Sequence, residues 1–255
     1  MFLCKMSVGL GTALILMAGA AWAEPTEIAV RVLSKDAKFV GTSMGGARIT
    51  LRDADTGELL ATGVTEGSTG DTATIMGSQD RRTPISSEDS AKFTAVIDLD
   101  RPRLITVTAL GPLGQRQSAV SVSSTQWVVP GKHITGGDGW VLEMPGLVVD
   151  VLDPPAHVQL QGTPQKINLA ANVTAMCGCP IEPGGLWDAD KLEVAAILAK
   201  DGEVQRTIPL EFAGATSQFA TKIELNEPGT YEATVYAYDA ANGNTGLDRV
   251  TFMIR

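Results

Sequence analysis

Cysteine, histidine and aromatic side chains are scarce in this chain of 255 residues. It has three cysteines and two histidines, and only 5% of its residues are Phe, Trp or Tyr. A closed zinc site would need both histidines beside two cysteines, and the usual finger spacing is lacking. The sequence also lacks a phosphate-binding loop, a dinucleotide fingerprint and an arguable pair of catalytic carboxylates. We therefore predict that the protein is not an enzyme.

Long apolar runs are missing after the N-terminal region. The first 23 residues combine Lys5, an apolar stretch over residues 8–17 and the small-residue ending Ala21-Trp22-Ala23. This pattern predicts a secretory signal peptide over residues 1–23. Cys4 lies before the apolar stretch rather than at the cleavage point, so we expect it to leave with the peptide and to carry no lipid anchor. The mature chain is predicted to be periplasmic or secreted.

Basic charge is also in short supply. The chain has 20 Lys and Arg against 29 Asp and Glu, and residues 1–23 contain one Lys and no acid, so the mature chain has 19 against 29 and a net charge of −10. This charge argues against nucleic acid and anionic membranes as partners. The simplest interpretation of the negative charge is that it keeps the protein soluble outside the cytoplasm. The second interpretation is that it favours the capture of cations. No later stretch approaches the roughly 18 apolar residues that a membrane span needs.

Short alternating runs of apolar and polar residues, bounded by Gly, Pro, Asn and Asp, recur throughout the chain. Such punctuation predicts strands and turns. In the first half we expect strands near residues 27–33, 47–52, 59–65, 92–98, 104–110 and 118–123. In the second half we expect them near residues 157–161, 166–174, 192–200, 207–212, 218–225, 229–239 and 247–254. The fold class predicted is all-β, with two antiparallel β-sandwich domains in tandem after the signal peptide.

The domain boundary is expected at a proline-rich linker over residues 153–156, between domains at residues 24–152 and 157–255. Consecutive prolines hold the chain extended, which predicts a short, stiff connection. The polar stretch at residues 66–91 has almost nothing apolar to bury, so we expect it to be a long loop that is largely disordered. A second irregular segment at residues 129–145 holds His133 and Trp140 and could cover a site.

Two short stretches resemble known families of exported β-sandwich domains. Residues 46–58, with a strand, an Asp-Thr-Gly turn and the start of a second strand, resemble the opening hairpin of carboxypeptidase-regulatory-like (transthyretin-like) domains. Residues 228–244, with the run Pro-Gly-Thr-Tyr-Glu-Ala-Thr-Val, resemble the last hairpin of bacterial Ig-like domains. The second resemblance implies that the Tyr231 hydroxyl makes a tyrosine-corner hydrogen bond. Such modules serve as spacers, binding units and accessory domains, so the resemblances bear on fold rather than on function.

The segment Met176-Cys177-Gly178-Cys179-Pro180 contains the two cysteines that remain after the signal peptide, next to a thioether. Thiolates and thioethers are soft ligands that select Cu(I), and thiolates also select zinc. Cys177 and Cys179 would then be thiolate ligands, Met176 a weaker ligand, and His133 or His157 would complete the shell. The leading hypothesis is accordingly a copper carrier or assembly factor for an exported metalloenzyme.

Two other interpretations of the cysteine pair stay open. Exported cysteines commonly form disulfides, which predicts a structural or protein-interaction module whose Cys177–Cys179 bond pins a loop. A ring with one intervening residue would be easily reduced, which predicts instead a thiol–disulfide redox partner, although the usual C-x-x-C spacing is absent. In every case we expect a protein partner in the periplasm.

Three further motifs are explained more simply by turns. Residues 41–45 satisfy G-x-S-x-G, but a strand rather than a helix is expected to follow, so we do not assign a nucleophilic serine. Residues 53–57 offer carboxylates two apart but lack the ligand spacing of a calcium loop. Asp239 with Asn242 and Asn244 could ligate calcium, yet Asn-Gly is a strong hairpin signal.

Overall fold

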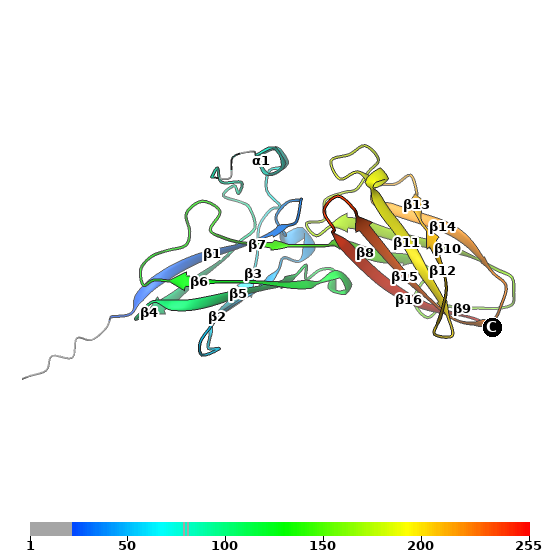
Figure 1. Ribbon diagram of the computed structural model, residues 1–255, viewed down its shortest axis with the longest axis horizontal. Coiled ribbons are helices and arrows are strands. Elements are labelled where there is room, and N and C mark those ends of the chain that lie inside the picture. The colour runs from blue at the N-terminus through cyan, green and yellow to red at the C-terminus, as the bar shows by residue number, and fades with distance from the viewer. Residues whose placement is uncertain (1–21, 79, 81) are drawn as a thin grey trace, which may run out of the picture.

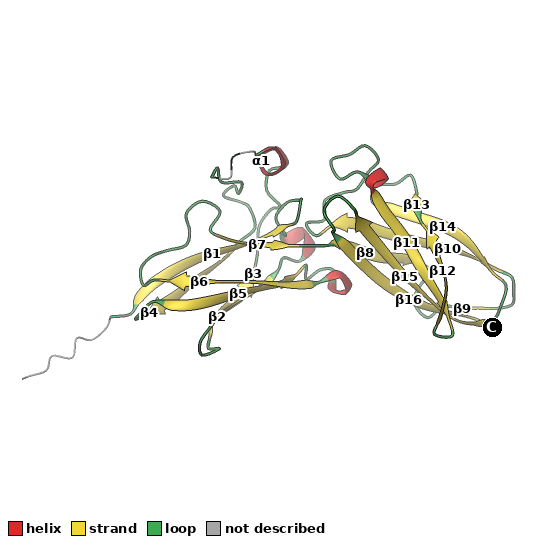
Figure 2. Ribbon diagram, viewed as in Figure 1, coloured by secondary structure: helices red, strands yellow, loops and turns green. Residues whose placement is uncertain are grey.

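The chain forms two β-sandwiches that lie end to end (Figure 1). The computed structural model describes residues 22–78, 80 and 82–255, so most of the predicted signal peptide, including Cys4 and Lys5, lies outside the described residues. Strands dominate and helices are limited to short turns (Figure 2). The prediction of an all-β fold with two sandwiches is confirmed. Within the described residues, no helix is both long and apolar enough to cross a membrane.

The first sandwich packs a three-stranded sheet on a four-stranded one. The three-stranded sheet has the order β4 (Phe93–Leu99), β1 (Glu24–Ser34), β7 (Trp140–Met144). The four-stranded sheet has the order β3 (Leu59–Val64), β2 (Arg48–Asp53), β5 (Arg103–Gly111), β6 (Val120–Val128). Alternate residues of these strands, such as Ile28, Val30 and Val32 of β1, fill the core between the sheets.

The second sandwich packs a four-stranded sheet on a five-stranded one. The smaller sheet has the order β13 (Glu211–Phe212), β14 (Gln218–Leu225), β10 (Gln165–Ala175), β8 (Leu147–Asp153). The larger has the order β12 (Glu203–Pro209), β11 (Leu192–Lys200), β15 (Gly229–Asp239), β16 (Thr245–Ile254), β9 (Gln159–Leu160). Leu169, Val235 and Phe252 are fully buried in its core.

The strand pairing corrects two expectations. Most neighbouring strands are antiparallel as predicted, but β1 pairs with β7 and β16 pairs with β9 in parallel. In addition, β8 pairs with β10, so residues 147–153 belong to the second sandwich and the chain passes between sandwiches just after Met144. The predicted linker at residues 153–156 therefore follows the first strand of the second unit, and the segment at residues 129–145 ends in a strand.

The polar stretch at residues 66–91 is more regular than predicted. It contains a short helix, α1 (Thr72–Gly77), and it is tied at both ends by bridges that pair Glu66 with Lys92 and Ser68 with Ser90. The Asp138 carboxylate also accepts hydrogen bonds from the backbone N–H groups of residues 85 and 86, at 3.0 and 2.8 Å. The expected disorder is wrong for the described part of this loop, because polar contacts replace the apolar burial that it lacks.

The hairpin expected at residues 46–58 and the tyrosine-corner bond expected of Tyr231 are both present. Residues 46–58 contain β2 and the turn that leads to β3, and in this turn Asp53 Oδ1 accepts hydrogen bonds from the N–H groups of Asp55 and Thr56. The Tyr231 hydroxyl donates to the Glu227 carbonyl at 2.8 Å, which is the expected tyrosine-corner bond. The carboxylate of Asp239 likewise accepts bonds from Ala241 and Asn242 within its own turn.

Candidate functional site

The Cys177–Cys179 pair lies in a tight turn at the end of β10. Gly178 has a φ of 77°, a left-handed conformation that glycine adopts without a steric penalty. Its N–H donates to the Ala175 carbonyl at 2.8 Å, and the Ala175 N–H donates to the Cys179 carbonyl at 3.3 Å. The two cysteine Cα atoms are 5.4 Å apart and their sulfurs are bonded to each other. The turn is therefore closed by a disulfide.

This turn is buried between the two sandwiches. Cys177 is 2% exposed and Cys179 is 4% exposed. They form a small apolar cluster with Ala175 of the second sandwich and Ala37 of the first, and the indole of Trp187 packs against it. Both sulfurs thus face protein from two domains rather than open solvent.

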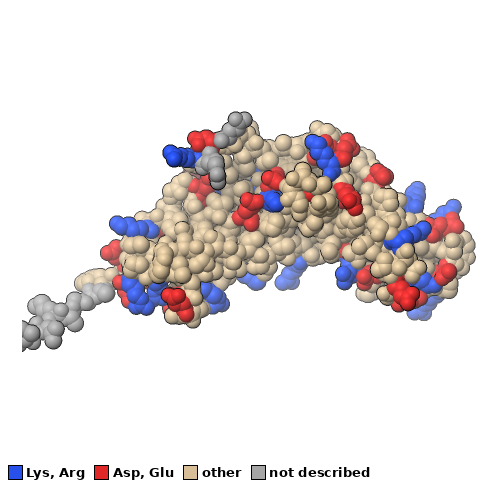
Figure 3. Space-filling view, viewed as in Figure 1, with Lys and Arg blue, Asp and Glu red and all other residues tan. Residues whose placement is uncertain are grey.

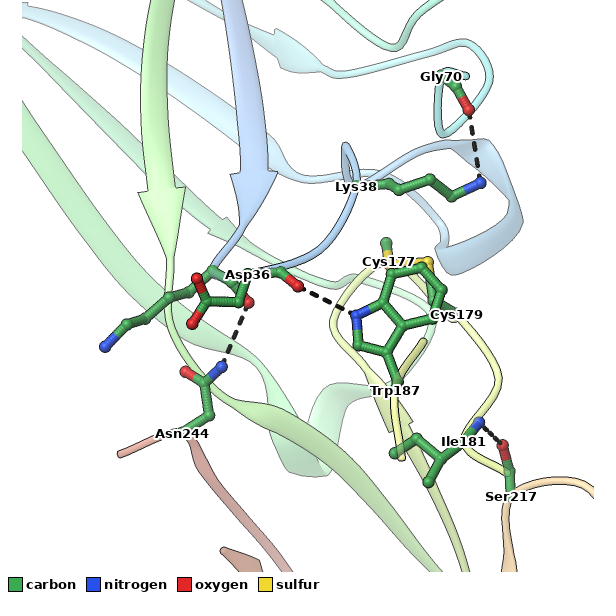
Figure 4. The surroundings of a disulfide bond; sticks show 10 residues. Asp36, Lys38, Gly70, Cys177, Cys179, Ile181, Trp187, Ser217 and Asn244 are labelled. Carbon is green, nitrogen blue, oxygen red and sulfur yellow. Dashed lines mark hydrogen bonds between the residues drawn. A yellow bond between two sulfur atoms is a disulfide. The ribbon is translucent and has the colours of Figure 1, made fainter. Parts of the chain in front are cut away.

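Hydrogen bonds between the sandwiches surround the same turn. Trp187 Nε1 donates to the Asp36 carbonyl at 3.0 Å (Figure 4). Lys35 Nζ donates to the Asn242 carbonyl at 2.7 Å, and Asn244 Nδ2 donates to the Lys35 carbonyl at 3.2 Å. We call this set of contacts the joint, and define it by residues 35–38, 44, 175–181, 187 and 242–244.

Met176 and Met44 complete the joint. Met176 is 1% exposed and packs in the core of the first sandwich, although it belongs to a loop of the second. Met44 lies so close to the turn that a Cβ added at Gly178 would be 2.6 Å from Met44 Sδ. Met44 belongs to a 3-10 helix (Thr42–Met44), and the strand β2 follows it, so residues 41–45 do not form a nucleophile elbow.

The two histidines lie far from the cysteines, at opposite ends of the molecule. His133 Nδ1 accepts a hydrogen bond from the N–H of Glu27, seven residues along β1 from its end at the joint, or about 23 Å at the usual rise per residue. His157 Nδ1 lies 3.1 Å from Thr251 Oγ1, near the other end of β16. The structure brings together Met176, Cys177 and Cys179 but neither histidine, so the expected ligand shell with His133 or His157 does not form.

The sulfur chemistry of the turn is set by the disulfide. A cysteine binds a metal ion or acts as a nucleophile through its thiolate, and a disulfide contains no thiolate. Within the described residues there is no group of three or more His, Cys, Asp and Glu side chains that could hold a metal ion. Cu(I) and zinc binding stay predictions that require the reduced protein.

A cavity of about 360 Å³ reaches the disulfide turn from the first sandwich. Lys38 is the charged residue of its lining, and its Nζ donates to the Gly70 carbonyl at 3.4 Å (Figure 4). A cation beside a cysteine favours the thiolate form. In the reduced protein, Lys38 would therefore favour the thiolate form of the pair.

The loop that carries Trp187 is held by one carboxylate. Asp188 Oδ1 accepts hydrogen bonds from the N–H groups of Gly184 at 2.8 Å and Asp190 at 3.1 Å. These bonds, the one from Gly184 first, hold the pKa of the Asp188 carboxyl below its usual value. An ionised Asp188 therefore stabilises the loop that carries Trp187 into the joint.

We expect the Asp188→Asn variant to lose stability mainly near neutral pH. Because the pKa of Asp188 is lowered by folding, its contribution is present above its unfolded pKa of about 3.9 and disappears as pH falls through the lower folded value. Urea midpoints of wild type and variant should therefore differ more at about pH 6 than at about pH 3, where acid has removed part of the carboxylate's contribution in the wild type and the variant has no carboxyl to titrate. Asp190→Asn, at an exposed neighbouring position, is the control. If the urea midpoints of wild type and Asp188→Asn differ equally at both pH values, the ionised Asp188 does not stabilise the loop.

Sequence reasoning found the sulfur atoms of the joint but missed its other half. The sequence points to Asn242 and Asn244 only as turn residues or calcium ligands, and nothing in it connects Trp187 with the cysteines. Their partners, Lys35 and Asp36, follow β1 and lie about 150 to 210 residues away in the sequence. No local pattern connects segments so far apart.

No protein-family model and no curated protein matches this chain. Among solved structures, fibronectin(III)-like modules of Clostridium thermocellum CbhA are 14% identical, with 91% of this chain and 94% of that chain covered and a TM-score of 0.30. A chimeric titin Z1Z2 is 11% identical, with 91% and 96% covered and a TM-score of 0.25. An engineered protein is 18% identical over 50% of this chain, which spans only 24% of that protein, with a TM-score of 0.32. These scores are too low to assign function, and the fold described above follows from the strand pairing itself.

Proposed function

We propose that this protein is an exported, non-enzymatic interaction module in which two β-sandwiches are held in a fixed relative orientation by the joint. The observation that carries the proposal is the burial of the Cys177–Cys179 disulfide against Ala37 of the other sandwich. A disulfide in that position stabilises the contact between domains. A carrier site for copper would instead need its sulfurs reduced and accessible to the donor and the acceptor of the metal.

The surrounding contacts support an orienting role. Met176 anchors the turn in the first core, Trp187 covers the disulfide, and Lys35 and Asn244 tie the two domains on the other side. A rigid pair of sandwiches presents its edges and grooves to a partner at a fixed angle, so less conformational entropy is lost on binding. The expected partner is another exported protein.

The double variant Cys177→Ser, Cys179→Ser tests the proposal. Opening a loop of three residues removes roughly 1.5 kcal/mol by the chain-entropy estimate, so both sandwiches should stay folded while the joint loosens. Small-angle scattering should show a broader distribution of interdomain distances, and the Trp187 resonance of protein labelled with 5-fluorotryptophan should shift and broaden. Unchanged scattering and an unchanged Trp187 resonance would contradict the orienting role.

Met176→Leu separates this proposal from the copper hypothesis. The substitution keeps the apolar volume at the joint, so an orienting joint should lose less than about 1.5 kcal/mol. A copper site should instead lose Cu(I) affinity in the reduced protein, because the thioether is gone. A titration of free thiols in the protein purified without reductant, paired with elemental analysis, completes the comparison: buried disulfide sulfurs should give no reaction until the protein is unfolded and reduced.

A further inference from the structure

The strand β6 is an open sheet edge without the usual protection. It pairs with β5 over nine successive residue pairs, with no shift in register, and its other side ends the four-stranded sheet. No charged residue occurs between Arg116 and Lys132, and residues 123–127 are all exposed. A long, regular and uncharged edge offers its free N–H and C=O groups to another strand.

The other edges of the two sandwiches carry features that discourage pairing. Four of these edge strands carry charged residues, and two others, β9 and β13, are only two residues long. The remaining edge strand, β3, is uncharged but short, and its register against β2 is shifted. The charged residues are Asp98 on β4, Glu143 on β7, Asp150 and Asp153 on β8, and Glu203 and Arg206 on β12. In the view of Figure 3, the surface over the middle of the first sandwich, where Figure 1 places β6, is uncharged.

An apolar groove lies at the start of β6, and exposed apolar side chains lie at its end. At its start, Ala119 and Val120 line a groove of about 480 Å³ between the sandwiches, together with Leu147, Tyr236 and Leu247. At its end, Trp127 is 63% exposed and Val129 is 42% exposed. A nine-residue strand is about 30 Å long, so these side chains cannot fill the groove of their own chain.

We infer that a second copy of this chain binds along β6, with the two β6 strands antiparallel and centred on Ser124. In that register Trp127 of the second copy lies opposite Ser121, and Val129 lies opposite Ala119 at the groove. The same two-fold axis places Trp127 and Val129 of the first copy at the groove of the second. A single two-fold rotation therefore pairs the open β6 edges of both copies and covers the exposed Trp127 and Val129 side chains of both.

The charge distribution favours this occupant. The chain has a net charge of −9, so most approaches of two copies are repulsive. The paired segments, from Gln117 to Gly131, carry no charge, and the first charges beyond them, Arg116 and Lys132, stand opposite each other at the two ends of the pair. An interface made of one strand pair and two apolar contacts is small for a protein dimer. We therefore expect reversible dimers with a Kd of roughly 10–100 μM.

Cross-linking at the two-fold axis tests the register directly. Residues opposed in an antiparallel pair have Cβ atoms about 4.5–5.5 Å apart, so Ser124→Cys should form a disulfide-linked dimer under mild oxidation. Gln205→Cys, on the edge strand β12, is the matched control that should stay monomeric. Equal cross-linking of the two variants, or none at Ser124→Cys, would overturn the inference.

Sedimentation equilibrium supplies the second measurement. Ser123→Lys places a charge on each open edge and should weaken dimerisation at least about tenfold, whereas Gln205→Lys should leave it unchanged. Trp127→Ala should weaken it roughly five- to tenfold by emptying the groove. A wild-type protein that is monomeric at a few hundred micromolar would overturn the proposal, even if it binds another extended polypeptide at β6.

The contribution of Trp127 rests on the proposed function of the joint, because the groove is lined by residues of both sandwiches. Strand pairing at Ser124 uses the first sandwich alone. If the joint is loosened by Cys177→Ser, Cys179→Ser, cross-linking should persist while the effect of Trp127→Ala shrinks. Failure of the joint and failure of the dimer therefore give different results.

Discussion

Phe252→Ala should lower the free energy of unfolding of the second sandwich by about 3–5 kcal/mol. Phe252 is fully buried on β16 and stacks on Tyr231 of the neighbouring strand, with ring centroids 5.5 Å apart. Removing the ring leaves a cavity between the two sheets and takes away the surface on which Tyr231 packs. Because the core strands hold this position from both sides, the site has little freedom to collapse.

Tyr231→Phe is the matched comparison. It keeps the stacked ring but removes the hydroxyl that donates to the Glu227 carbonyl, so it should cost only about 1 kcal/mol. Unfolding can be followed through Trp187, the one tryptophan of the second sandwich, as its 5-fluorotryptophan resonance during urea titration. Similar losses in the two variants would mean that the tyrosine corner, rather than the buried ring, dominates this end of the core.

The parts of the fold that sequence could predict are those fixed by local alternation. Ile167, Leu169, Ala171 and Val173 alternate along β10 with less buried residues, and all four face the core. The tyrosine corner was predictable for the same reason, because Tyr231 bonds a carbonyl only four residues away. Short-range spacing is sufficient for both.

The strand β8 shows where local reasoning fails. Residues 147–153 read as an apolar run that ends in consecutive prolines, and those prolines suggest a linker. The pairing of β8 with β10 depends on side chains of the second core, so β8 joins that sandwich although the prolines follow it. Strand assignment here is decided by tertiary packing rather than by the residues that end the strand.

The candidate site was predictable in its chemistry but not in its surroundings. The sequence of residues 176–180 shows that two cysteines and a thioether are adjacent, and a disulfide was one of three interpretations. Whether those sulfurs face solvent, a metal or another domain depends on contacts with residues 35–38, which are distant in sequence. The same holds for His133 and His157, whose separation follows from their positions at opposite ends of the two sandwiches.

Gly178→Ala should destabilise the joint by about 2–3 kcal/mol, more than loss of the disulfide itself. The left-handed conformation of Gly178 alone makes a side chain unfavourable by about 1–2 kcal/mol. In addition, the new Cβ would lie 2.6 Å from Met44 Sδ and 3.1 Å from its Cγ, so the Met44 side chain has to shift away from the turn and its contact across the joint is disturbed. The expected result is a shifted Trp187 resonance and a wider range of interdomain distances in scattering.

Gly184→Ala isolates the part of this effect that belongs to the contact between domains. Gly184 has a similar φ of 67°, but a Cβ there would meet nothing within 4 Å, so only the backbone penalty applies. Met44→Ala should restore much of the stability lost in Gly178→Ala, which a double-mutant cycle would measure as a coupling energy of about 1 kcal/mol. If Gly178→Ala and Gly184→Ala cost the same and show no coupling to Met44, the turn does not press on the first sandwich. The disulfide would then stabilise only its own loop, and the orientation of the two sandwiches would have to come from the hydrogen bonds of Lys35 and Asn244.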